Sequence, residues 1–410
     1  MRIVTESVLQ SVLARLHGQP RVVASGNFAT PWQAVKALDA ALPQYRLFAL
    51  NAQAGIPDRD GVTMESPFVG PGMRTSSRLR YLPCRLSLVP NLIKGPLPPD
   101  VVLVHTSAPV NGTVSLGTEV NVLPAAIEAA RARGGLVVAQ LNRHMPYTGG
   151  DAVLAEDEID LAIEADAPLS SPEPRTTSDV HLAIGERVAR LVPQAATLQL
   201  GIGAVPDAVL SALHGRRGLT VWSEMFSDGV LTLEQAGALD TSVPITASFA
   251  FGSAQLYSWI DRNPRVRMLR TEKTNNPGLI ARQPAMTSIN GALQVDLFAQ
   301  ANAARVKGMI YSGFGGQTDF VVGALHSTGG HAIIALPSWH PKAAASTVVP
   351  RLAGPVTSFQ HSYFVSEQGT ATIWGNDATE QATQIITHVA HPSVRDELQE
   401  AGRGLGFRLA

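Results

Sequence analysis

The sequence lacks several features on which whole classes of protein depend. It has one cysteine, Cys84, which excludes a disulfide framework and a metal site built on cysteines. Its 32 Lys and Arg residues are balanced by 33 Asp and Glu residues, and no run of basic residues stands out. A protein that binds nucleic acid or an anionic membrane usually carries an excess of positive charge. We therefore expect neither kind of partner.

Long apolar runs and a secretory signal are also missing. No hydrophobic stretch approaches the length that spans a bilayer. Residues 1–16 carry interspersed charges and are typical of an amphipathic helix. These features predict a cytoplasmic protein. No metal is expected, because the histidines show no metal-ligand spacing; the histidines considered are His144, His340, His361, His388 and His391.

The chain is long enough for two domains with large cores. It has 410 residues, of which 45% are hydrophobic. Strand-like and helix-like segments alternate, which indicates α/β domains with parallel sheets. Residues 54–99 are richer in Gly, Pro and Arg and indicate loops with short strands. The Pro- and Ser-containing segment 166–174 is typical of a linker. We expect one domain over residues 1–172 and a second over residues 173–410.

The stretch 197–229 has the strongest local pattern. A predicted strand, Thr197–Leu200, leads into Gly201 and Gly203, and Pro206 suits the first turn of a helix. A second short strand, Leu219–Trp222, is followed by Glu224. Ligands bind beyond the carboxyl ends of strands in open α/β sheets, so the glycine turn and the carboxylate are expected at a ligand site.

The pattern alone fits three interpretations. In a dinucleotide fold, Gly201 and Gly203 would open the pyrophosphate turn and Glu224 would hold a ribose hydroxyl, although Pro206 replaces the third glycine. In an acyl-transfer site, Glu224 would be a nucleophile and the turn would supply backbone N–H groups. The third interpretation is a turn and a solvated carboxylate without a chemical role.

The first half of the chain repeats this arrangement. Gly26 and Pro31 have the same separation as Gly201 and Pro206, and each pair follows a predicted strand and precedes a helix. Asn51 stands near the position that corresponds to Glu224. The similarity predicts two copies of one α/β unit with a ligand between them.

Several segments together resemble the acetyl-CoA hydrolase/transferase family of class I CoA-transferases. The chain is similar to the 4-hydroxybutyrate, butyryl and succinyl-CoA:acetate CoA-transferases of that family. The matching segments lie in the same order as in the family and cover nearly the whole chain: SLG at 115–117, NRHMPYTGGD at 142–151, LGIGAVPDAVL at 200–210, WSEMFSDGV at 222–230, NNP at 275–277, SINGALQVDLFAQAN at 288–302, GFGGQTDFVVGA at 313–324, IIALPS at 333–338, SEQG at 366–369 and AHP at 390–392.

The resemblance implies a fold and a mechanism. The fold would be two similar open α/β domains with the active site between them. Glu224 would attack an acyl-CoA to give a glutamyl anhydride, then a glutamyl-CoA thioester. CoA would be a substrate and not a bound cofactor, and the protein would be a homodimer or homotetramer. The resemblance implies oxyanion and CoA-binding roles at Gly201, Ile202, Gly203, Ala204, Val205, Asn275, Asn276, Asn290, Ser312, Gly315, Gly316 and Lys342, with support from Gly26 and Glu367.

Two segments depart from the family pattern. Ser358-Phe359-Gln360 replaces the usual Thr-Ser-Arg, and Trp374-Gly375-Asn376 replaces an Arg-Gly-Lys run, so two cationic positions are lost. The expected activity is CoA transfer between a short-chain acyl-CoA and a small carboxylate such as acetate. The alternatives are acetyl-CoA hydrolysis by the same glutamate, acyl-CoA binding without catalysis, and nicotinamide-dependent oxidoreduction.

Overall fold

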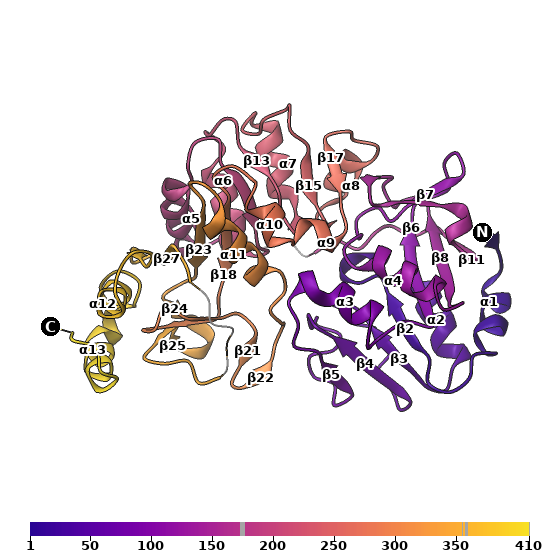
Figure 1. Cartoon of the computed structure of the whole chain (residues 1–410), viewed down its shortest axis with the longest axis horizontal. Helices are drawn as coiled ribbons and strands as arrows, with labels where there is room; N and C mark the ends of the chain where they lie inside the picture. The colour runs from indigo at the N-terminus through magenta and orange to yellow at the C-terminus, as the bar shows by residue number, and fades with distance from the viewer. Residues whose placement is uncertain (173–176, 355, 357–359, 410) are drawn as a thin grey trace. The chain divides into compact units, whose positions relative to one another are not determined.

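The computed structural model describes residues 1–172, 177–354, 356 and 360–409 (Figure 1). These residues form two compact units. Unit 1 comprises Met1–Pro172, Pro244–Thr274 and Ile310–Gly315, and unit 2 comprises Glu173–Val243, Asn275–Met309 and Gly316–Ala410. The expected division after residue 172 differs from these units in Pro244–Thr274 and Ile310–Gly315, which cluster with unit 1. Residues 173 and 174 of the expected linker, and the departures at Ser358 and Phe359, lie outside the described residues.

Unit 1 is built on a parallel sheet with helices in the crossovers. Its strands and helices are β1 (Arg2–Ile3), α1 (Glu6–Leu13), β2 (Arg21–Ala24), η1 (Asn27–Ala29), α2 (Trp32–Ala41), β3 (Tyr45–Phe48), β4 (Val62–Ser66), β5 (Leu79–Tyr81), η2 (Leu86–Leu88), α3 (Val89–Lys94), β6 (Val101–Thr106), β7 (Thr113–Ser115), α4 (Leu123–Arg131), β8 (Leu136–Asn142), β9 (Gly149–Gly150), β10 (Val153–Ala155), η3 (Glu156–Glu158), β11 (Leu161–Ala165), β15 (Ile245–Ala247), β16 (Phe249–Ala250), α8 (Ala254–Ile260), β17 (Val266–Met268) and α9 (Thr271–Thr274).

The main sheet of unit 1 is buried on both faces. Among the described residues its strand order is β1-β11-β8-β6-β2-β3-β4-β5, with parallel pairing throughout. All residues of β2 and β6 are buried. One set of side chains, which includes Val22 and Leu103, packs with Leu9 of α1 and Leu38 of α2 in one hydrophobic cluster. Parallel strands covered on both faces are expected to be apolar along their whole length, as the sequence is at 101–104.

Unit 2 has a second, smaller parallel sheet. Its strands and helices are α5 (Asp179–Leu191), β12 (Thr197–Leu200), α6 (Ala204–Ala212), β13 (Thr220–Val221), β14 (Met225–Phe226), α7 (Asp228–Gln235), α10 (Pro277–Ile280), β18 (Thr287–Gly291), β19 (Gln294–Asp296), β20 (Ala301–Asn302), β21 (Arg305–Val306), α11 (Gln317–His326), β23 (His331–Ala335), β24 (Trp339–His340), η4 (Pro341–Ala343), β25 (Ala345–Ser346), β26 (Val348–Val349), β27 (Tyr363–Val365), β28 (Thr370–Thr372), α12 (Ala378–His388), η5 (Pro392–Val394) and α13 (Arg395–Gly404), while β22 (Met309–Ile310) lies at the boundary of the units.

The two sheets share one topology. The described strands of unit 2 follow the order β13-β12-β18-β23-β27-β28, and only the last pairing is antiparallel. The core β27-β23-β18-β12-β13 matches β11-β8-β6-β2-β3 of unit 1, strand for strand and in chain order. The predicted fold class, two similar and mainly parallel α/β units, is confirmed.

The sequence interpretation was wrong in two places. Residues 1–16 are not one helix, because Arg2–Ile3 forms β1 beside β11 and α1 begins only at Glu6, after Thr5 as its N-cap. The segment 54–99 is not only loops and short strands, because it also contains the helix α3. Its Pro90 stands at the start of that helix, where proline fits. None of the described helices has the length and apolar character needed to cross a membrane.

Candidate active site

The chain around Glu224 is fixed to the end of the neighbouring strand. Glu224 stands three residues beyond β13, and Ser223 before it is fully buried. The Ser223 hydroxyl accepts a bond from the Leu200 N–H at 3.3 Å and lies 3.4 Å from the Leu200 carbonyl oxygen, to which it donates. The Trp222 N–H donates to the Leu198 carbonyl at 3.1 Å. Glu224 is thereby held at the carboxyl edge of the sheet, next to the turn that begins at Gly201.

The carboxylate of Glu224 is held by two donors from other segments of unit 2. The Asn275 side chain, which is fully buried, donates from Nδ2 to Oε2 of Glu224 at 2.8 Å. The backbone N–H of Gly316 donates to the same carboxyl group. Asn276 does not share this role, because its Oδ1 accepts the N–H groups of Gly278 and Leu279 and caps α10. In the NNP segment, Asn275 therefore contacts the Glu224 carboxyl group and Asn276 caps a helix.

Position 316 has room only for glycine, because the side chains of Glu224 and Asn275 lie against it. A Cβ at this position would lie 1.8 Å from Oε2 of Glu224 and 2.2 Å from Nδ2 of Asn275. Its φ of −94° is open to any residue, so backbone conformation is not the reason. Gly316 is the N-cap of α11 and has no side chain to cap that helix. The missing side chain lets the carboxylate approach the helix N-terminus directly.

The electrostatics of the site raise the pKa of Glu224. Burial of the carboxyl group raises its pKa from 4.5 to about 7. The hydrogen bonds from Asn275 and Gly316 oppose that shift, and the negative charge of Asp319 adds to it. Asp319 is fully buried in the first turn of α11. Asp319 was not among the site residues predicted from the sequence. The available signal was an acidic residue three positions after the glycines of GFGGQTD, at the start of a helix.

The glycine turn presents backbone donors at the start of α6. Gly203 has φ of +134°, a conformation that glycine adopts easily, and it forms the N-cap of α6. No side chain caps the N–H groups of Ala204 and Val205, and Pro206 has none. The N–H of Gly201 is already bonded to the Ile289 carbonyl at 3.0 Å. Of the donors predicted over residues 201–205, the Gly201 N–H is therefore already used within the sheet. Ile202 lies in the same turn with 43% of its surface exposed.

Three further residues of unit 2 that the sequence analysis selected belong to other local networks. Asn290 is buried, and its Nδ2 donates to Gln199 and Ser288 within the sheet. Glu367 is half-buried and accepts bonds from the backbone N–H and the hydroxyl of Ser338. Lys342 is exposed in η4, the short helix that follows β24. None of these contacts involves Glu224.

Gly26, Ser312 and Gly315 belong to unit 1. A Cβ on Gly26 would lie 2.0 Å from the Leu50 carbonyl oxygen, so this glycine permits the close approach of two chain segments. The Ser312 carbonyl accepts the N–H of Val69 at 2.8 Å. Gly315 has φ of +57° and lies against Phe68. Within the part of the chain that the structure describes, no group of three or more His, Cys, Asp or Glu residues is arranged to hold a metal ion.

Comparisons with known proteins agree with this arrangement. The sequence model of the acetyl-CoA hydrolase/transferase C-terminal domain matches residues 252–402. The 4-hydroxybutyrate coenzyme A transferase of Clostridium kluyveri is 39% identical over 79% of this chain and 77% of its own length. The succinyl-CoA:acetate/propanoyl-CoA:succinate CoA transferase of Fasciola hepatica is 35% identical over 92% of this chain and 83% of its own length.

A solved structure extends the likeness over the whole fold. The crystal structure of 4-hydroxybutyrate CoA-transferase from Porphyromonas gingivalis matches with a TM-score of 0.83 and 31% identity, over 98% of each chain. Identity of this extent, along most of the length of several enzymes, sets aside both a non-catalytic protein and a nicotinamide-dependent one. The chain belongs to the acetyl-CoA hydrolase/transferase family and is an enzyme of that family.

Proposed function

We propose that the enzyme transfers CoA between a short-chain acyl-CoA and a small carboxylate such as acetate, through a glutamyl-CoA thioester on Glu224. The observation that carries this proposal is the contact of the Glu224 carboxyl group with Asn275 and Gly316. A carboxylate must be positioned and partly removed from water to act as a nucleophile. The two donors position it, and its raised pKa reports its desolvation.

The chemistry balances without an external acid or base. The Glu224 carboxylate attacks the thioester carbonyl, the carbon–sulfur bond breaks, and CoA leaves as a thiolate. The thiolate then attacks the glutamyl carbonyl of the mixed anhydride, which releases the first carboxylate and leaves CoA on Glu224. An acceptor carboxylate reverses these two steps and leaves as the new acyl-CoA. Each step exchanges one anion for another, so ionised Glu224 is the reactive form.

Each addition places negative charge on a carbonyl oxygen, which needs fixed donors. The N–H groups of Ala204 and Val205 at the start of α6, and the Asn275 amide, are the donors we assign to this task. Loss of one such donor costs about 3 kcal/mol of transition-state stabilisation. Lys342 is assigned to the CoA phosphates, because an exposed ammonium group suits that contact.

Hydrolysis of acetyl-CoA by the same residue is the second candidate, because the family description includes both activities. Water that reached the anhydride or the thioester would intercept CoA transfer. Incubation of an acyl-CoA with excess acetate separates the two. Transfer forms acetyl-CoA and little free thiol, whereas hydrolysis releases one thiol for each thioester consumed, with or without acetate. A homo-oligomeric state and a cytoplasmic location stay predictions.

Trapping of the covalent intermediate tests the proposal directly. Acyl-CoA followed by borohydride should reduce the thioester on Glu224 to an alcohol, which peptide mass analysis locates. Glu224→Gln should lose both the trapped product and CoA transfer. Glu186→Gln makes the same chemical change at an exposed position of α5 and should retain both. Turnover retained by Glu224→Gln, or reduction at another residue, would exclude this mechanism.

A further inference from the structure

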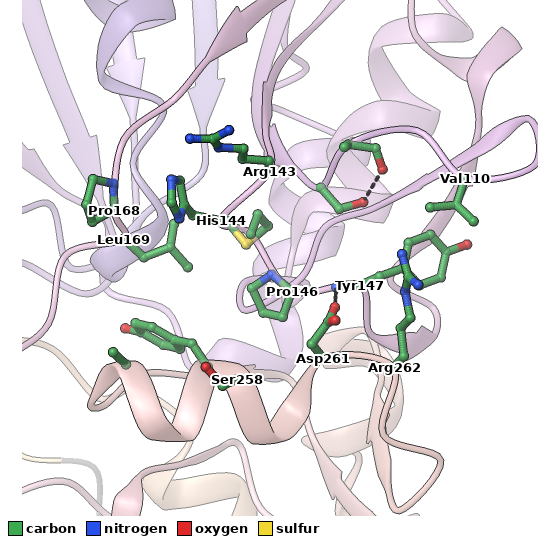
Figure 2. Close-up of a pocket in the computed structure, with 15 residues that line it drawn as sticks. Val110, Arg143, His144, Pro146, Tyr147, Pro168, Leu169, Ser258, Asp261 and Arg262 are labelled. Atoms are coloured by element: carbon green, nitrogen blue, oxygen red, sulfur yellow. Dashed lines mark hydrogen bonds between the residues drawn. The ribbon is translucent and has the colours of Figure 1, made fainter.

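A cavity of about 450 Å³ in unit 1 lies beyond the ends of three neighbouring strands. The segments that follow β6, β8 and β11 form one side of the cavity, and α8 forms the other (Figure 2). These strands are adjacent and parallel in the sheet. The carboxyl edge of an open parallel sheet is where such folds bind ligands. None of the residues that line this cavity belongs to the Glu224 site.

Hydrogen bonds hold the walls of the cavity in place. The Tyr147 N–H donates to Oδ1 of Asp261 at 2.7 Å, and the Arg262 N–H donates to the Tyr147 carbonyl at 2.8 Å. The Tyr147 hydroxyl is also bonded to Thr113 at 2.7 Å. On the opposite side, the Tyr257 hydroxyl donates to the Ser170 carbonyl at 2.9 Å. The site is therefore formed before a ligand arrives, which lowers the entropic cost of binding.

A second cavity of about 750 Å³ adjoins the first and shares Val110, Tyr147 and Arg262 with it. Figure 2 shows Arg262 beside Tyr147, on the side of the first cavity away from His144. Arg267 lines the second cavity. Arg262 therefore lines both cavities, and Arg267 adds a second guanidinium group to the second cavity.

The charge of the two cavities favours an anion. The second cavity has no carboxylate in its lining. The first has Asp261, whose Oδ1 already accepts the Tyr147 N–H. Arg143 and His144, on the far side, share the carboxylate of Asp166. Arg262 and Arg267 form no ion pair with any described residue, so both guanidinium groups are available to phosphate oxygens.

The lining of the first cavity is partly apolar. It includes Pro146, Pro168 and Leu169, and Ser258 offers a hydroxyl from α8 (Figure 2). Such a lining suits a ring with a few polar edges. A small carboxylate would not fill this volume or the adjoining cavity. A ring joined to more than one phosphate group matches both parts.

We propose that unit 1 binds a nucleoside phosphate in these two cavities, with the base in the first and the phosphate groups on Arg262 and Arg267. The ligand is a free nucleotide that binds apart from CoA, whose phosphates are assigned above to Lys342 of unit 2. The proposal does not depend on the chemistry at Glu224, because every residue that carries it lies in unit 1.

Calorimetric titration of the intact enzyme with ADP and AMP tests the site. Arg262→Gln keeps the backbone bond to Tyr147 and should weaken both nucleotides at least about tenfold. Arg267→Gln should weaken ADP more than AMP, because only ADP has a second phosphate group. Ser258→Phe should abolish binding by filling the first cavity. Arg133→Gln removes the same charge at an exposed position outside both cavities and should change nothing.

Competition with desulfo-CoA, which cannot be acylated, assigns the source of the nucleotide. If desulfo-CoA displaces ADP and is itself weakened by Arg262→Gln, the two cavities belong to the CoA site and the proposal is overturned. If ADP still binds beside saturating desulfo-CoA, the ligand is a free nucleotide. The proposal is overturned if neither ADP nor AMP binds at millimolar concentration. It is equally overturned if their affinity is the same in the wild type, Arg262→Gln and Ser258→Phe.

Discussion

The contact between Gly316 and Glu224 gives the sharpest prediction, which concerns Gly316→Ala. The added methyl group would lie 1.8 Å from Oε2 of Glu224, and even a separation of 3.0 Å would require the carboxylate to retreat by more than 1 Å. A displacement of about 1 Å at a reacting group costs about 100-fold in rate, or about 2.7 kcal/mol of barrier. The φ of −94° accepts alanine, so the backbone should not be strained. We expect a loss in kcat of at least about 100-fold with little change in the unfolding temperature.

Initial rates of CoA transfer to acetate, measured with saturating acyl-CoA, give kcat. Borohydride trapping then tells whether thioester formation is the step that is lost. Gly291→Ala is the matched control, since a Cβ there would meet nothing closer than 3.9 Å. That variant should keep normal rates. The reasoning fails if Gly316→Ala transfers CoA within about threefold of the wild type, or if it loses activity only because it unfolds.

Four further outcomes follow from the charges. Because the carboxylate of Glu224 is the reactive form and its pKa is about 7, kcat/KM should fall about tenfold per pH unit below 7, and a flat profile from pH 5 to 7 would refute this. Asp319→Asn removes a charge that raises that pKa and should move the midpoint of the profile to lower pH. Asn275→Ala removes a bond that lowers the pKa, so the midpoint should rise while kcat falls about 100-fold. The bond from Arg270 lowers the pKa of Glu128 from 4.5 to about 2, so the stabilisation by Glu128 is present above about pH 4.5 and is lost as the pH falls towards 2. The free energies of unfolding of Glu128→Gln and the wild type, measured by urea titration, should therefore differ by less than about 1 kcal/mol at pH 7, since Glu128 is half-exposed, and should converge near pH 2.

The sequence predicted the fold well where one local signal was enough. The apolar run at Val101–Val104 indicates a strand buried on both faces, and the glycines before Pro206 indicate a strand-to-helix turn. It failed where a distant segment decides the local structure. Arg2–Ile3 is a strand only because β11, far along the chain, offers it an open edge. No pattern within residues 1–16 contains that information.

The candidate site, like the fold, could be predicted only where a local pattern or the family resemblance marked a residue. The place of Glu224 after a strand made it a candidate, and the family resemblance selected it as the nucleophile and added Asn275 and Gly316. The bond between the Gly201 N–H and Ile289 was not predictable, because it depends on which strand lies beside β12. The contribution of Asp319 was missed for a related reason. Its effect on the pKa of Glu224 requires the start of α11 to lie close to a strand end about ninety residues earlier in the chain.

The duplicated topology shows that the scaffold alone does not make the site. Asn51 stands three residues beyond β3, as Glu224 stands three residues beyond β13, and β3 and β13 hold equivalent places in their sheets. The Asn51 amide donates to Oδ1 of Asn27 at 2.9 Å, and Asn27 in turn donates to the buried carboxylate of Glu119 at 2.8 Å. An amide at this position can fix a loop, but it cannot form an anhydride or a thioester by the route open to a carboxylate. One fold repeated twice thus supplies two similar strand ends, and we expect acyl transfer only at the end whose carboxylate lies between an amide and a helix N-terminus.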